Sequence, residues 1–246
     1  MNKKKSQSGS VHLIIIITII VIIVGLLGFA LYSNIAGSRY GGYGDTVISS
    51  LNNKYNEKFV IDSISKNGDP FTSDNDATYK AYCYKLNNKD LLFEATLNKD
   101  KTVSDNYGYK LLEKQTNDVI TQKFSNNGLD VVVYSNFYNE ANKAQVNKDV
   151  ILSSYINNNK PEMLIINIAI RDNSTSTKEE VTQSIKDAYE SLAIKAQYKV
   201  YIIDPSKFAD VEQHRQNSVA FSKTNVESYS LDDYALEIDG GLVKSI

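Results

Sequence analysis

The feature that most constrains this chain is a continuous apolar run near its N terminus, residues 11–33 (VHLIIIITIIVIIVGLLGFALYS). Between residues 13 and 31 there is no charged side chain, and the single polar one is Thr18. A helix needs about 20 apolar residues to cross a hydrocarbon core of about 30 Å. The run is longer than the apolar region of a cleaved signal peptide. We therefore expect one uncleaved transmembrane helix that contacts the lipid bilayer through residues 11–33.

The charges that flank the run predict its orientation. Lys3, Lys4 and Lys5 precede it, whereas Arg39 is the one basic residue between the run and Lys54. Basic residues are retained on the cytoplasmic side of a membrane. We expect residues 1–10 to form a cytoplasmic tail and everything after the helix to lie outside the cell. Residues 34–44 are rich in glycine, which is typical of a flexible linker.

The composition limits the class of protein. The chain carries 27 Lys and Arg against 29 Asp and Glu, which argues against nucleic acid as a partner. Its one cysteine, Cys83, excludes an intramolecular disulfide. A cysteine-poor ectodomain without tryptophan is typical of a bacterial cell-envelope protein rather than of a secreted animal domain.

Hydrophobic periodicity divides the rest of the chain into two expected modules. The first, residues 45–127, is predicted to begin with a helix capped by Asp45 and to continue with a strand over 60–64. A hairpin over 77–86 and 91–97 follows, with Cys83 as a small apolar sheet residue. A second helix is expected to end at Gly128.

The second expected module covers residues 128–246 and has less regular signals. Strands are predicted over 129–137, 163–170, 198–203, 219–222 and 235–239. Helices are predicted over 147–157 and 177–196 and just after Asp204-Pro205, and Gly240-Gly241 is predicted to form a turn. The fold class that follows is α+β: one N-terminal transmembrane helix, then one or two modules of helices packed on an antiparallel or mixed sheet.

One segment resembles a known kind of module. The pattern LNxKYxEKFxI, followed later by DNYxYKLLE, is similar to PepSY-like and cystatin-like modules of membrane-anchored extracytoplasmic proteins in Gram-positive-type bacteria. The resemblance rests on Leu51, Lys54, Tyr55, Glu57, Lys58, Phe59, Ile61 and residues 105–112. It implies a helix laid on a curved antiparallel sheet and a location outside the membrane. It implies no catalytic residues.

The N terminus also resembles a type IV prepilin. The segment KKKSQSGSVHLIIII has a basic leader that ends in Gly9, where a prepilin peptidase would cut. The family carries Glu at the fifth mature position, and this chain has Ile14 there. A pilin-like structural subunit is therefore an alternative that predicts a mature chain beginning at Ser10.

No catalytic, cofactor-binding or metal-binding residue is assigned from the sequence, because phosphate loops, GxSxG and metal-ligand spacings are absent. The histidines are His12, expected at the membrane interface, and His214, the obvious acid–base candidate, whose neighbours instead indicate a solvated side chain. The two acidic groups that could bind a cation are better explained as solvated surface; they are Asp69, Asp74 and Asp76, and Asp232, Asp233, Glu237 and Asp239.

These observations favour a non-catalytic interaction module at the cell envelope. Its expected partner is an envelope protein or peptide, bound at a shallow surface with an open strand edge or an apolar patch. The alternatives are the pilin-like subunit and an envelope hydrolase that uses a pair of carboxylates in a cleft.

Overall fold

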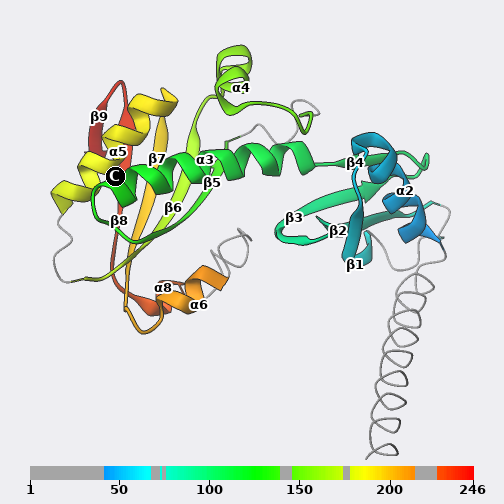
Figure 1. Cartoon of the computed structure of the whole chain (residues 1–246), viewed down its shortest axis with the longest axis horizontal. Coiled ribbons are helices and arrows are strands. Elements are labelled where there is room, and N and C mark those ends of the chain that lie inside the picture. The colour runs from blue at the N-terminus through cyan, green and yellow to red at the C-terminus, as the bar shows by residue number, and fades with distance from the viewer. Residues whose placement is uncertain (1–41, 68–72, 74–75, 139–145, 174–177, 214–225) are drawn as a thin grey trace, which may run out of the picture.

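The computed structural model describes residues 42–67, 73, 76–138, 146–173, 178–213 and 226–246, which form an α+β fold with two sheets (Figure 1). The predicted class is confirmed at this level. The expected tail, membrane span and most of the linker lie outside the described residues. Among the residues that are described, no helix has the length and apolar character needed to cross a membrane.

The first sheet has the strand order β1-β2-β3-β4, with every neighbouring pair antiparallel. Its elements are α2 (Tyr43–Tyr55), β1 (Phe59–Asn67), β2 (Thr78–Lys85), β3 (Asn88–Leu97) and β4 (Val103–Asp105). The predicted hairpin is confirmed as β2 and β3. Its turn is tighter than expected, because Lys85 pairs with Asn88 and Asn87 takes a positive φ of 71°.

Helix α2 packs on this sheet through apolar residues that recur at helical spacing. Val47, Leu51 and Tyr55 are buried against apolar residues of the strands, including Phe59 and Phe93. The predicted cap at Asp45 is wrong, because the helix begins at Tyr43 after Gly42 and Asp45 lies in its first turn. The ring of Tyr43 stacks on that of Tyr79 with centroids 4.1 Å apart, and this contact accompanies the earlier helix start.

Helix α3 (Tyr107–Asn126) belongs to both cores, although the predicted module boundary at 127/128 placed it in the first module (Figure 1). Tyr107 is buried in the first core, whereas Leu112, Ile120 and Phe124 are buried in the core of the second sheet. The helix ends as predicted at Gly128, which has a φ of 78°. The backbone N–H of Gly128 bonds Ser125 O and that of Leu129 bonds Phe124 O, the two bonds of a Schellman cap.

The second sheet has the order β5-β6-β7-β8-β9 and is mixed, because β6 and β7 are parallel while the other pairs are antiparallel. Its strands and helices are β5 (Val131–Phe137), α4 (Leu152–Asn159), β6 (Leu164–Arg171), α5 (Lys178–Leu192), β7 (Ala196–Ile203), α6 (Phe208–Gln213), α8 (Val226–Tyr229), β8 (Ser230–Asp239) and β9 (Leu242–Ser245).

Both faces of the second sheet carry a core. Apolar residues of α3 and α5 cover one face, and Phe208, Val211 and Val226 of α6 and α8 cover part of the other. The predicted strand over 163–170 is β6, which lies inside the sheet between β5 and β7. The Gly240-Gly241 turn is confirmed, with both residues at positive φ, and it leads into β9, which was not predicted.

Two predicted helices start later than expected. The helix predicted over 147–157 begins at Leu152, because the side chain of Gln115 binds the preceding backbone: its Nε2 donates to Val150 O at 3.1 Å and its Oε1 accepts from Leu152 N at 2.9 Å. The helix expected at Pro205 begins at Phe208, because Asp204 Oδ1 accepts from the N–H and hydroxyl of Ser206 and holds a turn there.

Candidate functional site

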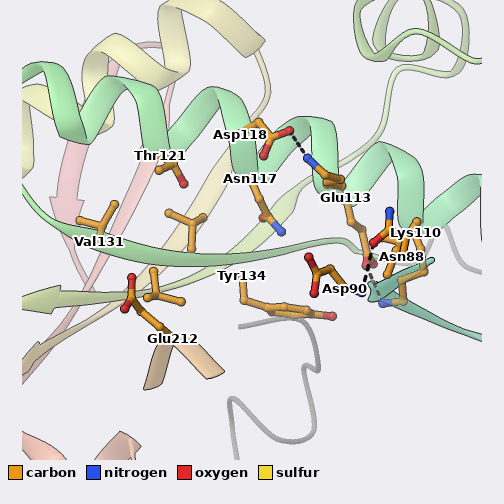
Figure 2. A pocket seen from close by; sticks show the side chains of 14 residues that line it. Asn88, Asp90, Lys110, Glu113, Asn117, Asp118, Thr121, Val131, Tyr134 and Glu212 are labelled. Carbon is orange, nitrogen blue, oxygen red and sulfur yellow. Dashed lines mark hydrogen bonds and ion pairs between the residues drawn. The ribbon is translucent and has the colours of Figure 1, made fainter. Parts of the chain in front are cut away.

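A groove lined by residues of both sheets runs along one side of α3, and we call it the junction groove (Figure 2). It encloses about 220 Å³. Its residues come from the start of β3, one side of α3, the edge strand β5 and the end of α6. They are Asn88, Asp90, Leu91, Lys110, Glu113, Lys114, Asn117, Asp118, Thr121, Val131, Val132, Val133, Tyr134 and Glu212.

The side of α3 that faces the groove is charged and mostly paired with itself. Lys110 Nζ lies 2.5 Å from Glu113 Oε2, and these side chains are 19% and 8% exposed. Lys114 and Asp118 form a second pair at 2.6 Å, well exposed to solvent. The i,i+3 and i,i+4 spacings put these residues on one face of the helix. Figure 2 shows Lys110 and Glu113 at the end of the groove where Asn88 and Asp90 also lie.

The Lys110–Glu113 pair is the most buried ion pair of the groove. Burial raises the pKa of Glu113, and the ammonium of Lys110 opposes that change. Burial lowers the pKa of Lys110, but the charge of Glu113 and the neighbouring Tyr134 outweigh it, so the net pKa of Lys110 is raised. Lys110 therefore stays protonated at neutral pH, and its Nζ also lies 5.7 Å from the centroid of the Tyr134 ring.

Strand β5 forms the floor of the groove and lies at one edge of its sheet among the described residues. Helix α3 covers the middle of its outer edge: Asn117 Oδ1 accepts a hydrogen bond of 2.7 Å from Ser135 N. Farther along, Phe137 O accepts from the Tyr109 hydroxyl at 3.3 Å. Covering an edge strand in this way hinders the addition of another strand. The groove is therefore suited to side chains of a partner rather than to a whole added strand.

The groove carries more negative than positive charge. Four carboxylates line it, and the two lysines of α3 pair with two of them. The other two, Asp90 and Glu212, are exposed and have no ion-pair partner within the described part of the chain. Figure 2 shows them at opposite ends, with the Tyr134 side chain between them in this view. Two unneutralised carboxylates on one concave surface favour a positively charged ligand.

The described lining can bind a partner through ion pairs and hydrogen bonds. That lining contains no cysteine or serine that could act as a nucleophile and no histidine that could act as its base. A carboxylate-pair hydrolase would need one carboxyl that stays protonated until it donates its proton to the leaving group. Glu113 has a raised pKa, but its oxygen lies 2.5 Å from the Lys110 ammonium, which favours the ionised form.

The motif behind the resemblance forms a polar network beside the groove. Asp105, whose side chain has 0% exposure, accepts from the Tyr55 hydroxyl at 2.6 Å and pairs with Lys54 Nζ at 2.7 Å. It also accepts from Tyr107 N at 3.1 Å, at the start of α3. Burial and the adjacent Asp105 carboxylate raise the pKa of Tyr55 well above its usual value. Tyr55 is therefore a permanent donor, and the network fixes α3 to α2.

Glu57 is the second centre of this network. It accepts from the Tyr107 hydroxyl at 2.9 Å and pairs with Lys85 at 3.0 Å and with Lys148 at 3.7 Å. Burial alone would raise the pKa of Glu57, but the hydrogen bonds and charges of its partners lower it below the usual value. Lys148 also donates to Tyr55 O at 2.6 Å, so the segment before α4 is tied to the first sheet.

Gly108 allows the same segment to approach α3. A Cβ at this position would lie 1.9 Å from Val146 O and 2.6 Å from Val146 C. No side chain larger than hydrogen fits without moving that backbone. The motif residues thus have a structural role, which is to hold α2, α3 and the 146–150 segment together beside the groove.

The residues singled out from the sequence do not converge. Cys83 is a fully buried residue of β2, as predicted, and burial raises its pKa to about 12. Glu237 binds Gln197 and Lys195, and Asp239 lies 3.5 Å from Lys195. The described residues contain no group of three or more side chains arranged to hold a metal ion. His12, His214, Asp69, Asp74 and the strand predicted over 219–222 lie outside those residues.

Sequence reasoning missed the groove residues Asp90, Lys110, Glu113 and Glu212. They lie on separate elements, so no local pattern joins them. The one available signal was the i,i+3 spacing of Lys110 and Glu113, which places them on one face of the predicted helix.

Comparisons with known proteins inform the fold. No family model matches the chain, and no curated protein matches it. A solved structure of a DUF5037 family protein from Ruminococcus gnavus ATCC 29149 is similar to it, with a TM-score of 0.60 and 17% sequence identity. The similarity covers 82% of this chain and 94% of that one. At this identity the likeness concerns the fold alone.

Proposed function

We propose that this chain is a membrane-anchored, non-catalytic binding module of the bacterial cell envelope, whose junction groove receives a basic segment of an envelope protein or peptide. The observation that carries the proposal is a groove, contributed by both sheets, in which Asp90 and Glu212 have no cation partner among the described residues.

The anchor is supported by the sequence. Residues 11–33 have the length and apolar character of a transmembrane helix, and three lysines precede them. In this arrangement residues 1–10 are cytoplasmic and the two sheets lie outside the cell. The resulting single-pass topology places the groove where it meets other envelope proteins.

The groove supports a basic partner through simple electrostatics. Lysine or arginine side chains that enter it can pair with Asp90 at one end and with Glu212 at the other, without breaking the Lys110–Glu113 pair. Charge complementarity of this kind raises association rates and selects partners by charge. A partner with an acidic segment is repelled by the same groove.

The topology is tested with cysteine labelling, because the native Cys83 is fully buried. Ser191, exposed on α5, and Ser6, in the expected tail, are changed to cysteine in separate full-length chains. A membrane-impermeant maleimide should label Ser191→Cys in intact cells. It should label Ser6→Cys only after the cells are lysed. Labelling in the reverse order, or of both in intact cells, would reject the proposed orientation.

The groove is tested by charge reversal. The variant Asp90→Lys/Glu212→Lys should lose its chemically cross-linked partners in membranes, measured by quantitative mass spectrometry. The matched control is Glu190→Lys/Asp233→Lys, which changes the net charge equally at exposed positions outside the groove. The control should retain its partners. Equal loss in the two variants would show that net charge, and not the groove, governs binding.

A further inference from the structure

The first sheet has a second face, opposite the one that α2 covers. Ala81 and Cys83 of β2 are fully buried in the first core beneath α2. Successive side chains of a strand alternate between its two faces. Their neighbours Tyr82 and Tyr84 therefore lie on the opposite face, which we call the outer face of the first sheet.

The outer face carries apolar side chains near the β2–β3 turn. Tyr82 is 39% exposed, and Leu86, in the turn, is 44% exposed. Val60 of β1 is the direct partner of Tyr84, so its side chain lies on the same face. Within the described ranges, these four residues belong to none of the hydrophobic cores. We call Val60, Tyr82, Tyr84 and Leu86 the tyrosine patch.

Two lysines lie beside the tyrosine patch. Lys89 Nζ lies 5.5 Å from the centroid of the Tyr84 ring, and Lys58 O accepts a hydrogen bond of 2.7 Å from Leu86 N. Both lysines are exposed, and neither has an ion-pair partner among the described residues. Tyrosine rings beside lysines are typical of surfaces at a membrane interface, where the ring lies at headgroup level and the ammonium stays in water.

The charge of the outer face is opposite to that of the chain as a whole. Of the 27 Lys and Arg, three precede the apolar run, which leaves 24 against 29 Asp and Glu. On the outer face, by contrast, the carboxylate of Glu94 is paired with Lys80 at 3.0 Å, and the two lysines beside the patch are unpaired. An acidic ectodomain is repelled on average by an anionic bilayer, so a face with unpaired lysines determines which side turns toward it.

We propose that the tyrosine patch docks on the anionic bilayer that holds the anchor. The rings of Tyr82 and Tyr84 lie at headgroup level, and Lys58 and Lys89 bind lipid phosphates. The docking rests on the transmembrane anchor of the proposed function. It is separate from the junction groove, whose lining includes none of these residues.

The length of chain between the anchor and the first sheet agrees with this contact. Helix α2 begins at Tyr43, so residues 34–42 separate it from the end of the expected span. A segment of nine residues reaches at most about 30 Å. With the outer face on the bilayer, α2 lies about one helix diameter, roughly 10 Å, above the sheet, which this segment can span. The short tether also gives the patch a high effective concentration at the lipid surface.

The docking is tested by fluorescence quenching of the full-length chain in liposomes made of equal amounts of phosphatidylcholine and phosphatidylglycerol. A fluorophore is attached at Ser63→Cys, opposite Tyr82 on the outer face, or at Ser49→Cys, on the exposed side of α2. The native Cys83 is fully buried and stays unlabelled. A nitroxide on the lipid headgroup should quench the label at 63 about fivefold more than the label at 49, because α2 holds position 49 roughly 10 Å farther from the lipid.

Charge reversal tests the role of the lysines. In the chain labelled at position 63, Lys58→Glu/Lys89→Glu should lower the quenching about fivefold, to the level of the label at 49, because it reverses the attraction to phosphatidylglycerol. The unsubstituted chain in phosphatidylcholine alone should show a similar loss. Quenching unchanged by both treatments would remove the lipid phosphates from the proposal.

Removal of apolar side chains tests the patch itself. Tyr82→Ser/Leu86→Ser should also lower the quenching at position 63. The matched control is Leu242→Ser/Ile246→Ser, which removes two side chains that are each 65% exposed at the edge of the second sheet. This control should quench like the parent chain, and equal losses in the two variants would contradict docking through the patch.

The remaining outcomes separate the docking from the anchor. Equal quenching of the labels at 63 and 49, in a chain that resists extraction by alkaline carbonate, would overturn the docking and leave the anchor intact. A chain that carbonate extracts has no transmembrane anchor, and the docking is rejected with it. Disulfide-linked dimers through Ser63→Cys in place of quenching by lipid would assign the outer face to a second copy of the chain.

Discussion

Gly108→Ala is the substitution whose effect the structure defines most sharply. The new methyl carbon would lie 1.9 Å from Val146 O, so that atom must move by about 1.1 Å merely to reach 3.0 Å, a distance below which such contacts are essentially never seen. The neighbouring backbone cannot move freely, because Lys148 is bonded to Tyr55 O at 2.6 Å and Val150 O to Gln115 at 3.1 Å.

The magnitude is the balance of two destabilising effects and one stabilising effect. Overpacking of a tight site destabilises by about 1–3 kcal/mol. Loss of a hydrogen bond from the charged Lys148 adds about 1.5 kcal/mol or more. Alanine in place of glycine in a helix gains at most about 1 kcal/mol. We expect Gly108→Ala to lower the free energy of unfolding by roughly 2 kcal/mol.

The assay is urea unfolding of the full chain in detergent, followed by far-ultraviolet circular dichroism. Gly44→Ala is the matched control, because it is also in the first turn of a helix and its Cβ would meet only Ile61 Cδ1, at 3.4 Å. It should be neutral or stabilise by up to about 1 kcal/mol. A Gly108→Ala protein as stable as the Gly44→Ala protein would refute the proposed close approach of residue 146 to α3.

Three other substitutions test the buried charges. Asp105→Ala removes the acceptor of three donors at a fully buried site and should destabilise by about 3 kcal/mol in the same urea assay, whereas the exposed Asp100→Ala should change stability far less. The pKa of Glu57 in the folded protein lies below its ordinary 4.5, so the ionised carboxylate stabilises the fold above that pH and this stabilisation is lost as the pH falls below it. Urea midpoints measured from pH 7 to pH 3 should therefore fall less steeply in Glu57→Gln. Lys110→Met leaves the Glu113 carboxylate buried without its cation and should destabilise by about 3–5 kcal/mol at neutral pH and by less in acid, where that carboxyl is protonated. Lys110→Met/Glu113→Leu should recover most of the loss, and a double variant no better than the single one would contradict this explanation.

Elements with a strong local period could be predicted from the sequence. The alternation of Tyr79, Ala81 and Cys83 against Phe93 and its neighbours fixes a hairpin, because only one face of each strand can be buried. Helix α3 and its end were also predictable, since Gly128 adopts the positive φ that its cap requires.

The elements that were missed are governed by contacts distant in sequence. Helix α4 begins five residues late because Gln115, on another helix, binds the backbone on both sides of Ile151. Strand β9 has four residues, too few to show a period. The junction groove joins Asn88, Lys110, Val131 and Glu212 from four separate elements, so no window of sequence contains it.

The most direct test of the proposed function is photo-crosslinking in living cells with a photoreactive amino acid at Asn88, in the groove, and at Glu190, outside it. The account predicts an adduct from position 88 alone, and mass spectrometry should place the cross-link in a segment of an envelope protein rich in lysine or arginine. Adding Asp90→Lys/Glu212→Lys should abolish that adduct. Equal adducts from the two positions, or a cross-linked segment that is acidic or neutral, would contradict the central claim.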